Sequence, residues 1–110
     1  MKNRYLEKLS EIENFKENWD GHSAPAFSKK LINKVKVIID NSTIQPEIFP
    51  TALGTIQLEY DNSRKDHMEI EISEAEEAKI YTVFSNGEEI EEVISSDIAT
   101  INEKVKIFFE

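Results

Sequence analysis

The sequence predicts an α+β fold, a two-layer sandwich in which three helices cover one face of an antiparallel sheet of three to four strands. Three observations lead to this class. Apolar residues repeat at helical spacing near both ends of the chain, they alternate with polar residues in the middle, and the alternating segments follow one another without a helix between them. The length of 110 residues suits a single domain over residues 1–110. The expected order of elements is α-α-β-β-β-(β)-α.

Residues 3–18 form the first expected helix, because their apolar side chains recur about every 3.5 positions with Lys and Glu on the other face. The helix is expected to end at Gly21, which can adopt the left-handed conformation that closes a helix, and Pro25 prevents its resumption. Trp19 continues the apolar spacing. This favours a core position for Trp19 over the alternative of an exposed anchor for a partner.

A second helix is expected to begin at Ser28, whose side chain can accept a hydrogen bond from the first free backbone N–H groups. Phe27 is expected to pack against Ile32 across this cap. The helix is expected to end at Asn41, and an extended passage begins at Ile48.

Alternation of apolar and polar residues then predicts the strands. The segments with strand character are 56–60, 68–72, 80–84 and 88–94. The third is rich in β-branched and aromatic residues, so we expect a central strand with both faces covered. Asn86-Gly87 predicts a tight hairpin into the fourth, whose many charges suit an edge. A last helix with apolar positions over 98–108 is capped by a residue within 95–97.

Two registers remain open for the first hairpin, because the buried faces fix only the parity of the pairing. One places Leu58 opposite Met68. The other places Leu58 opposite Ile70, and it also places Glu59 directly opposite Glu69. Like charges in opposed positions repel, so we prefer the first register.

Charge is distributed unevenly along the chain, whose formal net charge is −9. Residues 1–42 hold eight basic and six acidic residues, a net of +2, whereas residues 43–110 hold five basic and sixteen acidic residues, a net of −11. A field of this sign repels nucleic acid phosphates and anionic membranes and attracts a basic protein surface. We therefore expect a basic protein partner, no direct nucleic acid binding and no membrane binding. The alternative is an acidic surface that serves solubility alone.

Several chemistries are excluded by residues that the sequence lacks. There is no cysteine, and so no disulfide, thiolate metal site or cysteine nucleophile. There is no G-x-S-x-G and no glycine-rich phosphate loop, and we assign no catalytic residue. No apolar leader or membrane-spanning run is found, and we expect a cytoplasmic location.

One group of residues fits a metal site. A histidine nitrogen with carboxylate oxygens suits Mn, Fe or Zn. The candidate ligands are Glu59, His67, Glu69 and Glu71. The alternative, which we favour, is a solvated strand face that needs no cofactor.

Two further patterns are weaker. Glu77-Ala78-Lys79, with Asp61 or Asp66 upstream, is similar to the acidic and Lys pattern of metal-dependent nucleases, but the net charge opposes a nucleic acid substrate. Asp20, His22 and Ser23 supply the residue types of a catalytic triad within one loop. A triad converges from separate elements, so we expect a solvated or capping role instead.

Two segments together resemble a known group of proteins. Trp19-Asp20-Gly21-His22-Ser23-Ala24-Pro25 gives a W-D-G-x-x-A-P stretch, and residues 50–59 give P-T-x-x-G-x-I-x-x-E. The chain resembles, over roughly its first two thirds, small bacterial and phage-borne proteins that carry both stretches. Tyr60 stands where that group has Trp. The group has no established activity, so the resemblance implies a common fold and no mechanism.

The two motif segments can be explained as turn chemistry, which we prefer, or as a recognition surface. In the second case the two loops lie at one end of the sheet, and the surface comprises Asp20, His22, Thr51 and Glu59.

These observations lead to one function hypothesis and two alternatives. The first is a small, acidic, non-enzymatic protein-binding module that neutralises a basic partner, as an antitoxin or a phage inhibitor does. Its expected partner-binding residues are Asp20, His22, Thr51, Glu88, Glu89, Glu91 and Glu92. The alternatives are a small metal-dependent enzyme that uses the His and Glu group, and a structural subunit that forms a homodimer.

Overall fold

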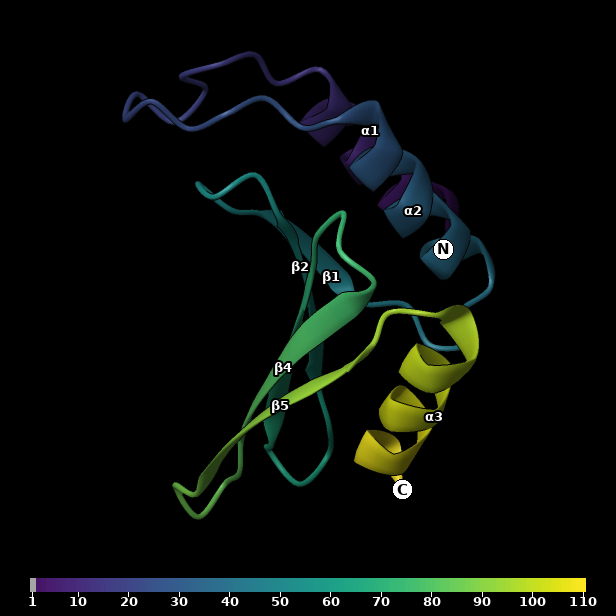
Figure 1. Ribbon diagram of the computed structural model, residues 1–110. Coiled ribbons are helices and arrows are strands. Elements are labelled where there is room, and N and C mark those ends of the chain that lie inside the picture. Colours follow the sequence, from purple (N-terminus) through teal and green to yellow (C-terminus); the bar gives the residue numbers. More distant parts are fainter. Residues whose placement is uncertain (1) are drawn as a thin grey trace.

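A computed structural model describes residues 2–110, with side chains described from Arg4 onward. It confirms the α+β class, with three helices and one antiparallel sheet, but the sheet has five strands where three to four are expected (Figure 1). The strands lie in chain order, β1-β2-β3-β4-β5. The elements are α1 (Lys2–Glu13), α2 (Lys29–Asp40), β1 (Glu47–Pro50), β2 (Ile56–Asp61), β3 (His67–Ile72), β4 (Glu77–Val83), β5 (Glu89–Ser95) and α3 (Ile98–Phe109).

The strand that the sequence does not predict is β1. The expected extended passage from Ile48 is present, and it pairs with β2 so that Ile48 lies opposite Leu58. Four residues are too few for apolar alternation to be recognised. Pro50 has no N–H to donate, and a strand that contains proline belongs at a sheet edge, where β1 lies.

Helix α1 is shorter than expected, because it ends at Glu13 rather than near residue 18. The side chain of Asn14 donates a hydrogen bond of 3.0 Å to the carbonyl of Ser10, and so takes an acceptor of the last helical turn. Gly21 therefore does not close the helix. It lies in a later turn, with φ of 77°, where its N–H donates to the carbonyl of Asn18.

The caps of the other two helices are confirmed. Ser28 is the N-cap of α2, and its side chain accepts a hydrogen bond of 3.1 Å from the N–H of Leu31. Asp97 is the N-cap of α3 and accepts a bond of 2.7 Å from the N–H of Thr100. Both caps satisfy backbone donors that a helix start leaves free.

The preferred register of the first hairpin is wrong, and the other register is present. Leu58 lies opposite Ile70, and Glu59 lies opposite Glu69. This register aligns three buried apolar pairs, Ile56–Ile72, Leu58–Ile70 and Tyr60–Met68. Burying one such side chain stabilises the folded state by about 1.5–3 kcal/mol, whereas an opposed like-charge pair destabilises it by less than about 1 kcal/mol. Packing of the apolar face therefore decides the register.

The expectation for β4 is wrong in part. β4 lies between β3 and β5, but the middle strand of the sheet is β3. Only one face of β4 is buried, while Lys79 and Tyr81 point to the other face. The reason is that all three helices lie on one side of the sheet (Figure 1). β5 is an edge strand as expected, and the tight connection at Asn86-Gly87 joins it to β4.

The core lies between the helices and the inner face of the sheet. It joins buried side chains from all three helices to those of β1, β2, β3 and β4. Trp19 lies in the loop after α1 and not on the helix, but it packs against this core as expected. Within residues 2–110, no helix combines the length and the apolar character that crossing a membrane requires.

Candidate functional site

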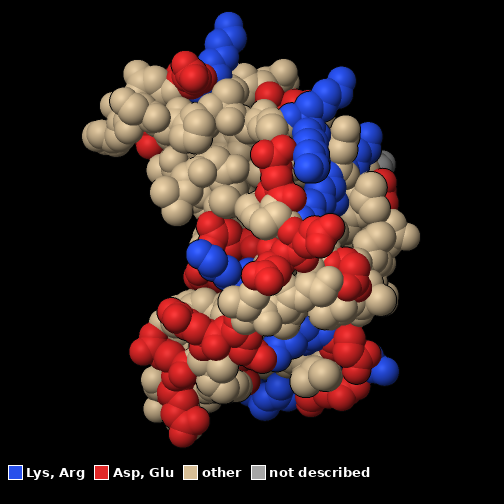
Figure 2. All heavy atoms as spheres, in the orientation of Figure 1, with Lys and Arg blue, Asp and Glu red and all other residues tan. Residues whose placement is uncertain are grey.

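The candidate site lies on the face of the sheet that no helix covers. Strand alternation gives this outer face every second residue of β2 to β5. We define the outer face by Gln57, Glu59, Asp61, His67, Glu69, Glu71, Glu77, Lys79, Tyr81, Val83, Glu89, Glu91, Val93 and Ser95. Lys79 is the only lysine or arginine among them. Figure 2 shows acidic side chains gathered over the middle and lower part of the molecule with a few basic ones among them, and several basic ones over α1 and α2.

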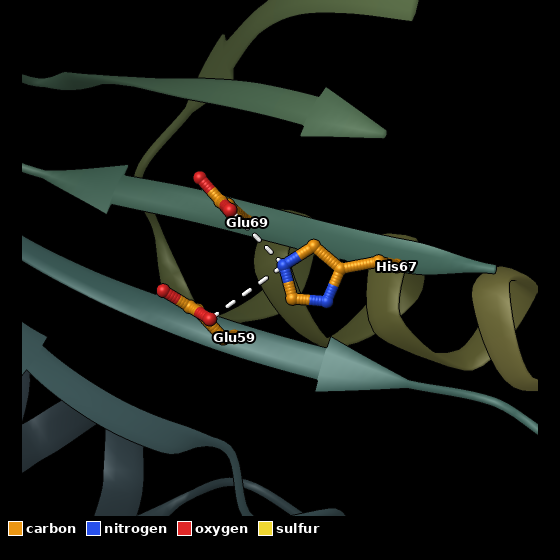
Figure 3. A group of neighbouring side chains, drawn as sticks. All are labelled: Glu59, His67 and Glu69. Carbon is orange, nitrogen blue, oxygen red and sulfur yellow. Dashed lines mark hydrogen bonds and ion pairs between the residues drawn. The ribbon is translucent and has the colours of Figure 1, made fainter. Parts of the chain in front are cut away.

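Three side chains of the outer face converge between β2 and β3. The Nε2 atom of His67 lies 3.0 Å from Oε2 of Glu69 and 3.5 Å from Oε1 of Glu59 (Figure 3). One ligand atom from each side chain lies within 4.8 Å of the other two. The imidazole stands between the two carboxylates because β2 and β3 place Glu59 directly opposite Glu69.

Two neighbours hold this group in place. Oδ1 of Asp61 lies 2.8 Å from Nδ1 of His67, and since a carboxylate only accepts hydrogen bonds, Nδ1 is the donor. Gln57 donates a hydrogen bond of 3.1 Å to Oε1 of Glu69, the oxygen that does not face His67. His67 and Glu69 are therefore both fixed from the side away from the centre of the group.

The electrostatics of the group reflect its partial burial. Partial burial raises the pKa of Glu59, and the neighbouring charge of Glu69 raises it further. Partial burial opposes protonation of His67, but the hydrogen bonds with Asp61 and Glu69 outweigh it and raise the pKa of the imidazole. Without another cation, the imidazole is the group that offsets the two opposed carboxylates.

Glu71, the fourth expected ligand, lies outside the group. It follows Glu69 by two residues on the same strand face, a separation of about 6.6–7 Å. Its Oε2 instead accepts a hydrogen bond of 2.7 Å from the hydroxyl of Thr55. Of the four ligands predicted from sequence, the structure thus brings three together and leaves Glu71 apart.

We expected the acidic residues in and before β5 to form one surface, but they do not. Glu89 and Glu91 lie on the outer face and are exposed, and Glu88 lies in the turn before β5. Glu92 points to the helix side, where its carboxylate pairs with the Nζ atom of Lys104 at 2.6 Å. The cause is strand alternation, which sends Glu91 and Glu92 to opposite faces.

A shallow hollow of about 550 Å³ lies on the outer face over the middle of the sheet. Its lining comes from β2, β3, β4 and β5 and contains carboxylates around one aromatic ring. The lining residues are Gln57, Glu69, Glu71, Lys79, Ile80, Tyr81, Glu91, Glu92 and Val93.

The loop residues proposed for recognition stabilise their own loops. Oδ1 of Asp20 accepts hydrogen bonds from the N–H groups of His22 (2.8 Å) and Ala24 (3.1 Å), and these bonds lower the pKa of Asp20. Thr51 accepts at its hydroxyl from the N–H of Leu53. These are turn and capping roles, as the preferred explanation expects.

The two motif segments do meet in space. Within the first segment, Trp19 donates a hydrogen bond of 2.9 Å from its ring to the carbonyl of Pro25, which holds the two ends of that segment together. A Cβ added to Gly54 would lie 3.1 Å from Cγ of Pro25, and Gly54 has φ of 81°. Gly54 is therefore required by both its conformation and its contact with Pro25. Glu59 belongs to the His67 group rather than to this contact.

The nuclease-like pattern is not assembled. Asp66 accepts a hydrogen bond of 2.9 Å from the N–H of Ser85, beyond the end of β4, whereas Glu77 begins β4. Asp61 is bound to His67. Asp61 and Asp66 thus lie near the end of β4, whereas Glu77 and Lys79 lie at its beginning.

Comparison with protein-family models, with curated proteins and with solved structures finds no match for this chain. The geometry of the outer face is therefore the basis for a function. Sequence analysis did not identify Gln57 and Tyr81 as members of the site. Strand alternation could have identified both residues, since it places them on the same face as the predicted acidic residues.

Proposed function

We propose that this protein is a non-enzymatic binding module whose outer face binds and neutralises a basic surface of another protein. The observation that supports this most is the composition of that face. It presents glutamates from all four of its strands together with Asp61, and Lys79 is its only lysine or arginine. Such a surface attracts a basic partner and speeds the encounter with it.

The hollow gives this surface a place for a basic side chain. Tyr81 offers an aromatic ring, and Glu69 and Glu91 offer carboxylates on either side of it. An arginine can stack on an aromatic ring and form paired hydrogen bonds with a carboxylate. Tyrosine is also enriched at protein interfaces. An arginine of the partner is accordingly the side chain that fits the hollow best.

The carboxylates of the acidic face lie outside the core. Its members project away from the core, and two of them, Glu59 and Glu69, are directly opposed like charges. An opposed like-charge pair is destabilising on a sheet. Charges that the fold does not need are consistent with a role in binding.

The experiment is affinity capture from a lysate of the native host at low and at moderate salt, with EDTA present throughout. The outer-face variant carries Glu71→Gln, Glu89→Gln and Glu91→Gln. The matched control loses the same charge from the exposed side of α1, through Glu7→Gln, Glu11→Gln and Glu13→Gln.

We expect the unaltered protein and the α1 control to capture a basic protein that the outer-face variant does not capture. Capture should weaken at moderate salt, because ions screen exposed charges. Equal capture by all three proteins, or capture of acidic proteins alone, contradicts the proposal.

A further inference from the structure

Glu59 and Glu69 are directly opposed carboxylates on the outer face, and Glu59 also lies opposite Glu47 of β1. The two side chains are half-buried, and opposed residues on antiparallel strands have Cβ atoms about 4.5–5.5 Å apart. A cation between the carboxylates removes the repulsion. The Nε2 atom of His67 points to this position from β3 (Figure 3).

The distances within the group match those between the ligands of one metal ion. Ligand atoms bound at about 2.0–2.2 Å, with angles between octahedral and tetrahedral values, stand about 2.9–3.5 Å apart. Nε2 of His67 lies 3.0 Å from the Glu69 oxygen and 3.5 Å from the Glu59 oxygen. All three ligand atoms lie within 4.8 Å of one another, so small side-chain rotations would complete a half-shell.

The supporting contacts are those that metal-bound histidines commonly have. A metal-ligating histidine usually donates its other ring N–H to a carboxylate, which fixes the ring and its tautomer. Asp61 does this at Nδ1 of His67, so an ion at Nε2 would replace only the proton that Nε2 shares with Glu69. Gln57 holds one oxygen of Glu69 and leaves the other facing the same point.

We propose that Glu59, His67 and Glu69 form a binding site for one divalent transition-metal ion such as Zn²⁺, with Asp61 as a positioning residue. Two carboxylates and a neutral imidazole carry a charge of −2, which balances a divalent ion. The imidazole favours Zn²⁺, Mn²⁺ or Fe²⁺ over Mg²⁺ and Ca²⁺, which prefer oxygen ligands. The remaining coordination positions face solvent, because the group lies on the open side of the sheet.

The test is calorimetric titration of the tag-free protein with Zn²⁺, and with Mg²⁺ for comparison. We expect one Zn²⁺ per chain, little binding of Mg²⁺, and a higher Tm with Zn²⁺, because an ion that binds the folded state stabilises it. His67→Ala and Glu69→Gln should each abolish this binding. Asp61→Asn should weaken it by about 10–100-fold.

Glu71→Gln is the matched control for Glu69→Gln. It removes the same charge from the same face of β3, but Glu71 lies outside the group. His22→Asn is the control for His67→Ala, because it removes the only other histidine. Both controls should bind Zn²⁺ like the unaltered protein.

Absence of Zn²⁺ binding in the unaltered protein overturns the proposal. Binding that survives both His67→Ala and Glu69→Gln overturns it as well, and equal loss in Glu71→Gln would indicate general charge attraction only. Circular dichroism of each variant separates loss of the site from loss of the fold. The capture experiment uses EDTA and variants outside this group, so the two proposals can fail independently.

Discussion

The two faces of the sheet are built from alternate residues of the same strands, yet they differ in almost every property. Ile70 is fully buried under the helices, while its neighbour Glu69 lies in the open acidic face. The register shows which face determines the fold, because three apolar pairs are aligned at the cost of opposing Glu59 and Glu69. The inner face thus determines the structure and leaves the outer face available for binding.

The sharpest test of this difference is a pair of substitutions at adjacent positions. Ile70→Ala should lower the free energy of unfolding by about 2–5 kcal/mol, because it removes fully buried methyl groups and leaves a cavity. Glu69→Gln should change it by no more than about 1 kcal/mol, because its ion pair with His67 is partly exposed. Urea unfolding of both variants measures the two values. Comparable losses would show that the outer face supports the fold as much as the inner one does.

The pH dependence of stability should show the His67 group directly. The folded-state pKa of His67 is raised, so the stability it contributes is fully present below its ordinary value near 6.5 and is lost as pH rises through the higher folded-state pKa. In metal-free protein, the advantage of the unaltered chain over His67→Ala should be larger at about pH 6 than at about pH 9. It should remain below about 1 kcal/mol, since the group is partly exposed.

Thermal unfolding across that range in the presence of EDTA provides the measurement. An advantage that grows with pH would mean that the imidazole does not offset Glu59 and Glu69.

Much of the fold follows from residue patterns, and the errors have local causes. The caps at Ser28 and Asp97 and the hairpin at Asn86-Gly87 were predictable because each depends on a few neighbouring residues. At the early end of α1, the side chain of Asn14 takes the carbonyl of Ser10, and the N–H groups of Asn14 and Phe15 bond to carbonyls three residues back instead of four. Strand β1 was missed because it is short.

The site was predictable in composition but not in arrangement. The sequence placed Glu59, His67 and Glu69 on one face, but which of them lie directly opposite one another depended on the register, and charge repulsion argued against the register that is present. The separation of Glu92 from Glu91 follows from alternation alone. In the sequence, the run of acids from Glu88 to Glu92 conceals this separation, because its members are continuous along the chain although a strand sends them to opposite faces.

Glu91 and Glu92 offer a second comparison between the two faces of the sheet. The expected change in the free energy of unfolding is smaller here. Glu92→Gln breaks the ion pair with Lys104 on the helix side and should cost about 0.2–1 kcal/mol. Glu91→Gln should cost nothing measurable, because Glu91 is exposed on the outer face. Chemical unfolding at low salt gives both values. A larger cost for Glu91→Gln would reverse the assignment of the two residues.

The smallest effect on stability is expected from the outer-face variant with Glu71→Gln, Glu89→Gln and Glu91→Gln. Removing three negative charges from a chain with net charge −9 relieves repulsion, so its Tm should be equal to or above that of the unaltered protein. Differential scanning calorimetry at low salt checks this. A clear decrease in Tm would mean that these carboxylates are part of the folding energetics.

Capture from the native host with the two triple variants is the most direct test of the proposal that the acidic face binds a basic partner. We expect a basic protein to be retained by the unaltered chain and by the α1 control, and to be lost when Glu71, Glu89 and Glu91 are neutralised. Retention of the same protein by the outer-face variant would contradict the proposal.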